Sequence, residues 1–374
     1  MDRAVIVLPD PLRIDGHIVE ITTKTLEGLT LLAREWPGEM VVVARQAPFS
    51  RSPAWTAVPR QDLPFDLEIS NAPRDSHALR AAAVMQAFHA PEDLGIVDVA
   101  GRRLVWIGEF PVRERIRVGT MSGSVVDKAR ATAGWLRKEP ALRRAVAQAG
   151  GFQANGYPAW DSYAKLSDKR LLYFDTRVTA SQMMSGTRAR RPVPGTLRLG
   201  FSGRHESVKG PLYAVAAYRK LRDAGADVSL DVFGEGSQTH QIARELSGDA
   251  RATIHGVVPY ADRWVDQVRD DVDLMLLPHT QGDPAGTYLE AAALGVPVLG
   301  FANAALSPLV KRHGIGWTVR PHDVDAMAEK VVELLSDGVE MARAGREGIS
   351  FMKEHTAEKE FRRRVQHLRE VAQV

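Results

Sequence analysis

Short runs of apolar residues recur along this chain, and the segments between them repeat apolar residues every three or four positions. The runs are nearly continuous rather than alternating with polar residues, which is typical of strands buried on both faces of a parallel sheet. In the first half they predict strands at 4–8, 40–44, 67–70, 104–107 and 171–174. In the second half they predict strands at 197–201, 228–233, 252–255, 274–277, 298–300 and 317–319.

The intervening segments have helical periods. Val324, Met327, Val331 and Leu334 fall on one face of a helix. Residues 82–88 have the apolar pattern of a helix, and the charged stretch 355–374 predicts an amphipathic helix. Strands that alternate with helices indicate parallel sheets covered by helices on both sides.

Eleven strands are too many for one small sheet, so we expect more than one domain. The stretch 185–196, SGTRARRPVPGT, is rich in Gly, Pro and Arg and is typical of a linker. The prediction is an α/β protein with two doubly wound, Rossmann-like domains that face each other across a cleft. The domains are expected at 1–190 and 191–354, and the helix at 355–374 is expected to return to the N-terminal domain.

The composition places the chain among ordinary globular proteins. It has 374 residues, of which 44% are hydrophobic and 25% are charged, and it has no cysteine. Disulfides, thiolate metal sites and a cysteine nucleophile are therefore excluded. No run reaches the ~18 apolar residues that a spanning helix needs, and the N-terminus lacks the pattern of a signal peptide. We expect a cytoplasmic protein.

The clearest local signal is LRLGFSGRHESVKGPLYAVAAYRKL, at 197–221. A strand runs into the turn Ser202-Gly203, and Arg204 and Lys209 follow before a helix that starts near Pro211. Ligands of open α/β sheets bind at the carboxyl ends of strands, and a helix N-terminus favours an anion. The two cations therefore indicate a phosphate site. The alternative is that both are solvated loop residues.

A second signal is QGDPAGTYLEAAALGVPVLGF, at 281–301. Its glycines allow the backbone amides near Gly286 and Thr287 to approach a phosphate closely. Glu290 is placed in the first turn of the helix that follows, where a carboxylate can accept two hydrogen bonds from a ribose diol. The alternative is that Glu290 only complements the helix dipole.

The order GRHESVKG, IHGVVPY and VDLMLLPHTQGDPAGTYLEAAALGVPV resembles the donor-binding half of GT-B glycosyltransferases, specifically glycosyltransferase family 4. The resemblance covers about 197–335 and is weak across 1–190. It implies that the first domain is the acceptor side and that the second binds a nucleotide-diphosphate sugar. It also implies transfer without a metal or other cofactor, by a hexosyltransferase-type enzyme that retains the anomeric configuration.

The resemblance also assigns roles to individual residues. Arg204 and Lys209 match the residues that hold the donor diphosphate, and Glu290 matches the second Glu of an E-x7-E motif, which holds the ribose. The remaining implied donor contacts are Gly16, Gly203, Gly234, Val257, Val258, Asp283, Gly286 and Thr287.

One position departs from the family pattern. The first Glu of E-x7-E would fall at 282, which is Gly282, and Asp283 lies one residue out of register. Either Asp283 substitutes for that Glu in contacting the donor sugar, or the sugar is held differently. Two alternatives to a transferase stay open: a nucleotide-sugar epimerase of the same architecture, and a non-catalytic nucleotide-sugar-binding homologue.

The stretch from Arg102 to Arg144 holds eleven basic and four acidic residues, with Trp106, Trp135, Leu136 and Leu142 between them. Such a stretch could dock on an anionic membrane face, where related enzymes take lipid-linked acceptors. The alternative is a solvated helix face. No base-stacking or recognition motif accompanies the charge, so no nucleic-acid partner is expected. The acceptor is therefore expected to be a saccharide or a lipid-linked molecule in polysaccharide or glycolipid assembly, with the enzyme at most peripheral to the membrane.

Four further features are weaker candidates. Asp271-Val272-Asp273 has the D-x-D spacing of a metal motif but lies where a helix meets a strand, which favours a structural role. His89 and Glu109 are candidates for an acceptor site. The segment 150–163, GGFQANGYPAWDSY, is expected to form a rigid turn with polar and aromatic residues suited to sugar binding.

Overall fold

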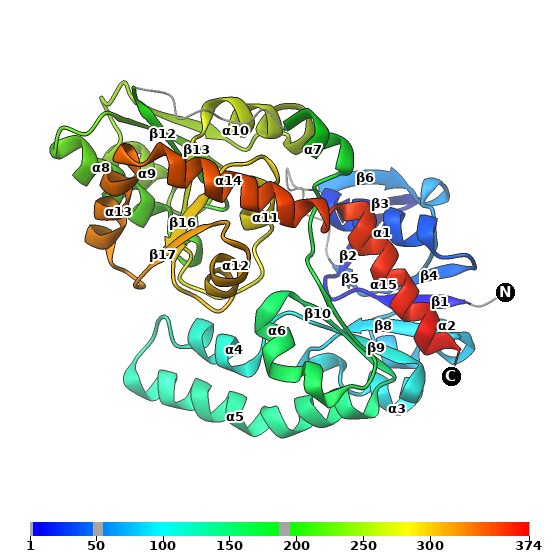
Figure 1. The fold of residues 1–374 in the computed structure, drawn as a ribbon. Coiled ribbons are helices and arrows are strands. Elements are labelled where there is room, and N and C mark those ends of the chain that lie inside the picture. Colours follow the sequence, from blue (N-terminus) through cyan, green and yellow to red (C-terminus); the bar gives the residue numbers. More distant parts are fainter. Residues whose placement is uncertain (1–2, 48–54, 187–194, 374) are drawn as a thin grey trace. The chain divides into compact units, whose positions relative to one another are not determined.

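The computed structural model describes residues 3–47, 55–186 and 195–373 and divides into two compact units (Figure 1). The first unit is Met1–Arg177 together with Ala357–Val374, and the second is Val178–Thr356. The units therefore change at 177/178 and 356/357, compared with the expected 190/191 and 354/355. Most of the expected linker, 187–194, lies outside the described residues.

The first unit is built on a seven-stranded sheet in which every neighbouring pair is parallel, in the order β11-β10-β9-β8-β1-β4-β7. Its strands are β1 (Ala4–Val7), β4 (Met40–Ala44), β7 (Asp66–Ile69), β8 (Val84–Phe88), β9 (Leu104–Gly108), β10 (Gly151–Asn155) and β11 (Arg170–Tyr173).

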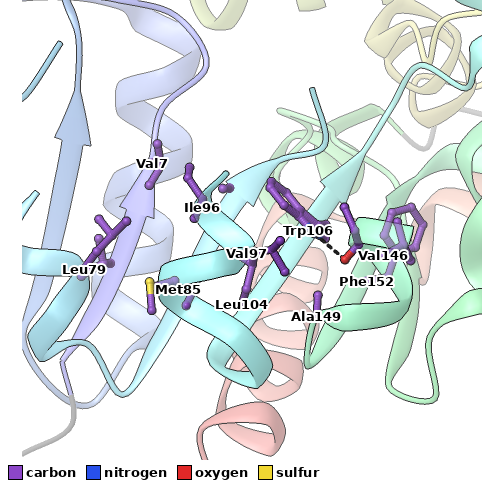
Figure 2. Packing of buried hydrophobic residues seen from close by; sticks show 14 of the residues in the cluster. Val7, Leu79, Met85, Ile96, Val97, Leu104, Trp106, Val146, Ala149 and Phe152 are labelled. Atoms are coloured by element: carbon purple, nitrogen blue, oxygen red, sulfur yellow. Dashed lines mark hydrogen bonds between the residues drawn. The ribbon is translucent and has the colours of Figure 1, made fainter. Parts of the chain in front are cut away.

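Both faces of this sheet are covered, which explains the continuous apolar runs. In β1, Val5 and Val7 pack into one hydrophobic cluster, while Ala4 and Ile6 pack into another. The first cluster also contains Trp106, which is fully buried and donates from its indole Nε1 to the Ala145 carbonyl at 3.0 Å (Figure 2). The helices of the unit are α1 (Thr23–Glu35), α2 (His77–Ala81), α3 (Ile96–Ala100), α4 (Val112–Gly119), α5 (Val125–Gln148), α6 (Gly156–Tyr163) and α15 (Ala357–Ala372).

The C-terminal helix α15 belongs to the first unit, although the second unit precedes it in the sequence. Its Phe361, Val365, Leu368 and Val371 are buried in the second cluster of the first unit. The sequence pattern of 355–374 thus has an apolar face, and this face packs on the seven-stranded sheet.

The first unit also has a small mixed sheet that was not expected from the sequence; two of its strands lie between β1 and β4 in chain order, and two lie between β4 and β7. Its order is β5-β2-β3-β6, with β2 (Leu12–Asp15), β3 (Ile18–Thr22), β5 (Gln46–Ala47) and β6 (Trp55–Pro59). The strand β3 alternates buried and half-buried residues. Such a short, one-sided pattern is much weaker than that of a parallel strand buried on both faces.

The second unit has a six-stranded sheet, again with only parallel pairs, in the order β14-β13-β12-β15-β16-β17. Its strands are β12 (Leu197–Ser202), β13 (Val228–Phe233), β14 (Ala252–Gly256), β15 (Leu274–Leu277), β16 (Val298–Phe301) and β17 (Gly316–Val319). Its helices are α7 (Ala180–Gly186), α8 (Pro211–Asp223), α9 (Thr239–Glu245), α10 (Val265–Asp271), α11 (Gly286–Ala293), α12 (Leu306–His313), α13 (Val324–Ser336) and α14 (Gly338–Lys353).

All eleven predicted strands are present, each within about one residue of its expected bounds, but two segments were wrongly predicted. Residues 82–88 were expected to be helical, yet Val84–Phe88 is the strand β8. The segment 150–163 was expected to be a rigid turn, yet it forms the strand β10 followed directly by α6. In β10 the polar Gln153 is buried and accepts a hydrogen bond from Gln86 at 2.8 Å. The polar residues of this segment therefore do not indicate a loop.

Each sheet reverses its strand order once. In the first unit, β4 and β7 are added on one side of β1, and β8 then returns to the other side. In the second unit, β13 and β14 are added on one side of β12, and β15 returns to the other side. Such topological switch points are where open α/β sheets bind ligands.

Candidate functional site

The switch point of the second unit brings together the loops that follow β12 and β15. After β12, a short 3-10 turn (Ser207–Lys209) leads through Gly210 into α8. Gly210 has φ of 69°, and a Cβ atom there would lie 2.2 Å from the carbonyl oxygen of Pro278, just after β15. Only a glycine permits this close approach. The backbone amide of Thr280 also donates to the Val208 carbonyl at 3.1 Å.

Lys209 and Asp283 form an ion pair across these two loops. The Lys209 Nζ lies 2.9 Å from the Asp283 Oδ2, and Lys209 is only 9% exposed. The other carboxylate oxygen, Oδ1, is buried and has no hydrogen-bond partner among the described residues. A buried acceptor without a partner costs free energy, so this oxygen is poised for a donor from a ligand.

His279 is a residue of this region that sequence reasoning missed. It lies two residues after β15, is 1% exposed, and neither ring nitrogen has a partner among the residues that the structure describes. Burial holds the pKa of His279 well below its ordinary value, and the nearby charge of Lys209 lowers it further. The imidazole is therefore neutral at pH 7 and can accept a hydrogen bond from a ligand.

Tyr288 and Asn303 position His279. The Tyr288 ring lies against the imidazole at a centroid distance of 4.9 Å. The Asn303 Nδ2 donates to the His279 carbonyl and to the Tyr288 hydroxyl, each at 3.2 Å. The only signal in the sequence for this residue was a histidine two residues after a buried strand. The supporting Asn303 lies on a separate loop.

The predicted glycines meet at the carboxyl ends of β12, β13 and β14. A Cβ atom on Gly234 would lie 2.0 Å from the Gly203 carbonyl oxygen, and the Gly234 amide donates to Gly256 at 2.7 Å. Val257 and Val258 follow β14; the first is 56% exposed and the second is half-buried. The absence of a side chain at Gly234 thus allows the ends of β12 and β13 to lie close together.

The remaining predicted residues of the second unit are arranged as follows. Arg204 is exposed on the loop that also carries Lys209. Gly286 and Thr287 are the first two residues of α11, as expected. Glu290 is half-buried in the second turn of α11 rather than the first, because the helix begins at Gly286. At that distance from the N-terminus the helix-dipole explanation loses force, since the effect is confined to the first turn.

Gly16 belongs to the first unit. It has φ of 56° and forms the turn between the antiparallel strands β2 and β3. It follows the first strand, β1, in sequence, with β2 between them. A donor contact from Gly16 stays a prediction.

The D-x-D spacing has a structural role. Asp273 accepts from the guanidinium of Arg198 at 2.7 Å and from its backbone amide at 3.0 Å. This pairing ties the start of β15 to β12, at the end of the sheet opposite the carboxyl ends.

Comparisons with known proteins agree with this arrangement. Residues 196–337 match the sequence model of the family described as "Glycosyl transferases group 1". The chain is 28% identical to a 2-deoxystreptamine glucosyltransferase of Streptomyces kanamyceticus over 165 residues, which is 42% of each chain. It is 31% identical to a glycogen synthase of Mycobacterium tuberculosis over 167 residues, 42% of this chain and 38% of that one. The matches therefore span about two-fifths of these relatives.

The whole chain is similar in structure to HepE of Anabaena, solved in complex with UDP and glucose. The TM-score is 0.63 at 13% identity, and the similarity covers 100% of both chains. At that identity the likeness concerns the fold. The chain therefore has the GT-B fold, and within its second unit residues 196–337 match the group 1 glycosyl transferase model.

Proposed function

We propose that this protein transfers a sugar from a nucleotide-diphosphate donor to an acceptor hydroxyl. The observation that carries the proposal is the buried Lys209 ammonium at the switch point of the second unit, next to a carboxylate with one unpartnered oxygen. A nearly buried cation on a loop that opens a helix suits a diphosphate. The family match over the same residues, and the complex of HepE, which has the same fold, with UDP and glucose, support this assignment.

In this proposal the residues of the second unit stabilise the leaving group. The bond from the anomeric carbon to the diphosphate breaks, the bond to the acceptor oxygen forms, and the acceptor proton passes to the departing diphosphate. Lys209 and Arg204 offset the charge that develops on the diphosphate. A single well-placed contact of this kind contributes about 3 kcal/mol to the transition state. Glu290 holds the ribose, and the reaction needs no metal and retains the anomeric configuration.

We further propose that Asp283 replaces the family carboxylate that is missing at Gly282. Its Oδ2 is engaged by Lys209, which leaves Oδ1 to accept a hydroxyl of the donor sugar. His279 is the second acceptor of this part of the site. The donor sugar would thus be held by a residue one position out of the usual register.

The first test is turnover of a panel of UDP-, GDP- and ADP-sugars, with and without acceptor lipid. A transferase releases nucleoside diphosphate, faster when acceptor is present, and yields a product with the retained anomeric configuration. Interconversion of the nucleotide sugar would instead indicate an epimerase. Binding without any turnover would indicate a non-catalytic homologue, and an inverted product would contradict retention.

The first unit has a surface suited to an anionic membrane, although its composition differs from the expectation. Trp106 and Leu142 are fully buried, so they contribute nothing to a surface. Arg102 and Arg103 donate to carbonyls around the start of β9 rather than joining the helical face. The basic stretch is therefore divided, because it crosses a buried strand.

The remaining surface lies at the turn between α4 and α5. Val118, Met121, Val125 and Val126 are exposed there, and Val125 reaches 84%. We call these four residues the α4–α5 tip. Exposed cations flank the tip on the same two helices: Arg113, Arg117, Arg130, Arg137 and Lys138.

Exposed apolar residues with flanking cations suit insertion into an anionic lipid surface. Among the described residues no helix is long and apolar enough to cross a bilayer. We propose that the α4–α5 tip docks the protein on an anionic membrane face, where a lipid-linked acceptor would be available.

A further inference from the structure

The first unit contains a cavity of about 420 Å³ at its own switch point. Leu8 and Asp10, which follow β1, line one part, and Phe88 at the end of β8 lines another. These strands are the neighbours at which the strand order reverses. The cavity therefore has the position where open parallel sheets bind ligands, and its volume is in the range of small-molecule pockets.

A carboxylate faces this cavity in a fixed orientation. Glu109 follows β9, and its Oε1 accepts a hydrogen bond from the Asn155 Nδ2 at 2.8 Å. The Asn155 Oδ1 accepts from the backbone amide of Asp175 at 3.0 Å, so the amide cannot turn freely. Among the described residues Glu109 has no second hydrogen-bond partner and no ion-pair partner. Burial raises the pKa of Glu109 from its ordinary value.

The cations of the cavity already have partners. Lys24 pairs with Asp175 at 2.5 Å. Arg364, from α15, has its guanidinium over the ring of Tyr173 at 4.5 Å, and its Nε donates to the Gln153 Oε1 at 3.2 Å. Arg364 is 6% exposed and is thus held by a ring and by neutral amides.

The charges that line the cavity balance. Three acids and three bases line it, so the formal charge is zero when His89 is neutral. His89 is neutral at pH 7, because burial lowers its pKa to about 4. The charged residues are Asp10, Glu109, Asp175, Lys24, Arg115 and Arg364.

The wall of the cavity is aromatic where it is not charged. Phe88 and Phe110 line it and are half-buried, so part of each ring is accessible. Aromatic faces pack against the C–H groups of a sugar ring, while carboxylates accept its hydroxyl hydrogens. A ligand with an apolar face, several hydroxyls and no net charge matches both features.

We propose that this cavity binds a neutral saccharide ring, with a ring hydroxyl donating to Glu109 and the ring face packed on Phe88 or Phe110. That the bound saccharide is the acceptor rests on the transferase function proposed above. The binding itself does not, because every contact comes from the first unit.

Titration of the full-length chain with methyl α-glucopyranoside, followed by saturation-transfer NMR without nucleotide, tests this. Methyl α-glucopyranoside should bind in the millimolar range. Glu109→Gln and Phe88→Leu should each weaken binding roughly tenfold or more, since a hydrogen bond to a charged group or a packed ring is lost. The control Glu92→Gln, at an exposed acid outside the cavity, should bind normally.

Two charged probes and one second-unit variant complete the experiment. Glucose 6-phosphate and glucosamine should bind more weakly than the neutral glycoside, and Lys209→Ala should leave glycoside binding unchanged. Three results would each overturn the proposal. The first is tighter binding of glucose 6-phosphate than of the neutral glycoside, and the second is unaltered glycoside binding by folded Glu109→Gln and Phe88→Leu. The third is loss of glycoside binding in Lys209→Ala. Nucleotide binding measured on the same samples tests the transferase function separately.

Discussion

Lys209 is a cation that is almost fully removed from water, and its charge is offset by one carboxylate. Pairing with Asp283 at 2.9 Å makes the burial tolerable, because an unpaired buried charge is far more costly. A bound diphosphate would compete with Asp283 for the same ammonium. The donor must therefore be recognised against a carboxylate that is already in place.

Changing Asp283→Asn tests this competition. Removing the negative charge should tighten binding of free nucleoside diphosphate several-fold, because repulsion between the carboxylate and the phosphates is lost. The nucleotide sugar should gain less, because the asparagine cannot accept the sugar hydroxyl as strongly. The ratio of the two dissociation constants, measured by calorimetry, is the readout. Equal gains for the diphosphate and the nucleotide sugar would contradict a sugar contact at Asp283.

The buried His89 should make the free energy of unfolding depend on pH. Its ring donates from Nε2 to the Leu142 carbonyl at 2.8 Å, and burial, with a smaller effect of Arg115, lowers its pKa to about 4. Below pH 6.5 His89 is protonated in the unfolded chain, whereas in the folded chain it stays neutral until the pH approaches 4. The contribution of neutral His89 to the free energy of unfolding is thus fully present above pH 6.5 and is lost as the pH drops towards 4. The loss from this residue is about 3 kcal/mol.

Comparison of His89→Gln with the parent chain isolates this contribution. The measurement is the free energy of unfolding, obtained by denaturant titration between pH 7 and 4. The glutamine keeps an N–H donor for the Leu142 carbonyl but cannot be protonated. The variant should lose less stability over this interval, by about 3 kcal/mol. Identical slopes in the two proteins would show that His89 does not remain neutral in the folded state.

At the scale of elements, the site depends on how closely two loops approach. Gly210 allows the loop after β12 to contact the end of β15, and this contact sets Lys209 opposite Asp283. Similarly, the Gly234 backbone approaches the Gly203 carbonyl because Gly234 has no side chain. Gly210 and Gly234 are therefore positions of close packing in the loops of the second unit.

Gly210→Ala is expected to lower the free energy of unfolding by about 2 kcal/mol or more, because the left-handed conformation is strained and the new Cβ meets the Pro278 carbonyl. Binding of nucleoside diphosphate should fall as well. Gly225→Ala is the matched control: its φ is 79°, but a Cβ there meets nothing within 4 Å. If both variants lose the same stability and both bind normally, the loop contact does not position Lys209.

The sequence predicted most of the strands that are buried on both faces, except β8 and β10, and missed the small mixed sheet. Runs such as Met40–Ala44 are apolar throughout, as suits a strand of a parallel sheet that is covered on both faces. The strand β10 was missed because Gln153 is polar, and only its pairing with Gln86, distant in sequence, makes burial acceptable. The Lys209 and glycine positions were predictable because they lie in local motifs. His279 was not, because its setting depends on Asn303 from another loop.

At the scale of the whole molecule, two parallel sheets each have a polar site at a switch point. In the second unit this is the Lys209–Asp283 pair, and in the first it is the cavity beside Glu109. The chain completes its first unit with its last helix, since α15 supplies both core residues and Arg364. The lining of the cavity in the first unit thus comes from both ends of the sequence.

The proposed docking of the α4–α5 tip on an anionic membrane would determine where the whole molecule is located. Changing Val125 and Val126 to serine together should reduce binding to phosphatidylglycerol vesicles roughly tenfold, since exposed apolar area that would insert into lipid is lost. Val332→Ser, at an apolar residue 51% exposed in the second unit, serves as the control and should have no effect. Sedimentation with vesicles is the measurement, and phosphatidylcholine vesicles should bind all variants weakly. Unchanged binding by the double variant would dismiss the tip as the docking surface.

Calorimetric titration of UDP, GDP and ADP into the parent chain, Lys209→Ala and Lys220→Ala tests the central claim most directly. Lys220 is an exposed lysine on α8 whose Nζ lies 2.6 Å from Asp325, so it controls for loss of charge alone. At least one diphosphate should bind the parent chain and Lys220→Ala equally. The same diphosphate should bind Lys209→Ala roughly tenfold or more weakly, because a charge-assisted contact is lost and Asp283 is left unpaired. Equal binding by a folded Lys209→Ala, or no binding of any of the three to the parent chain, would contradict a diphosphate site at the β12–β15 switch point.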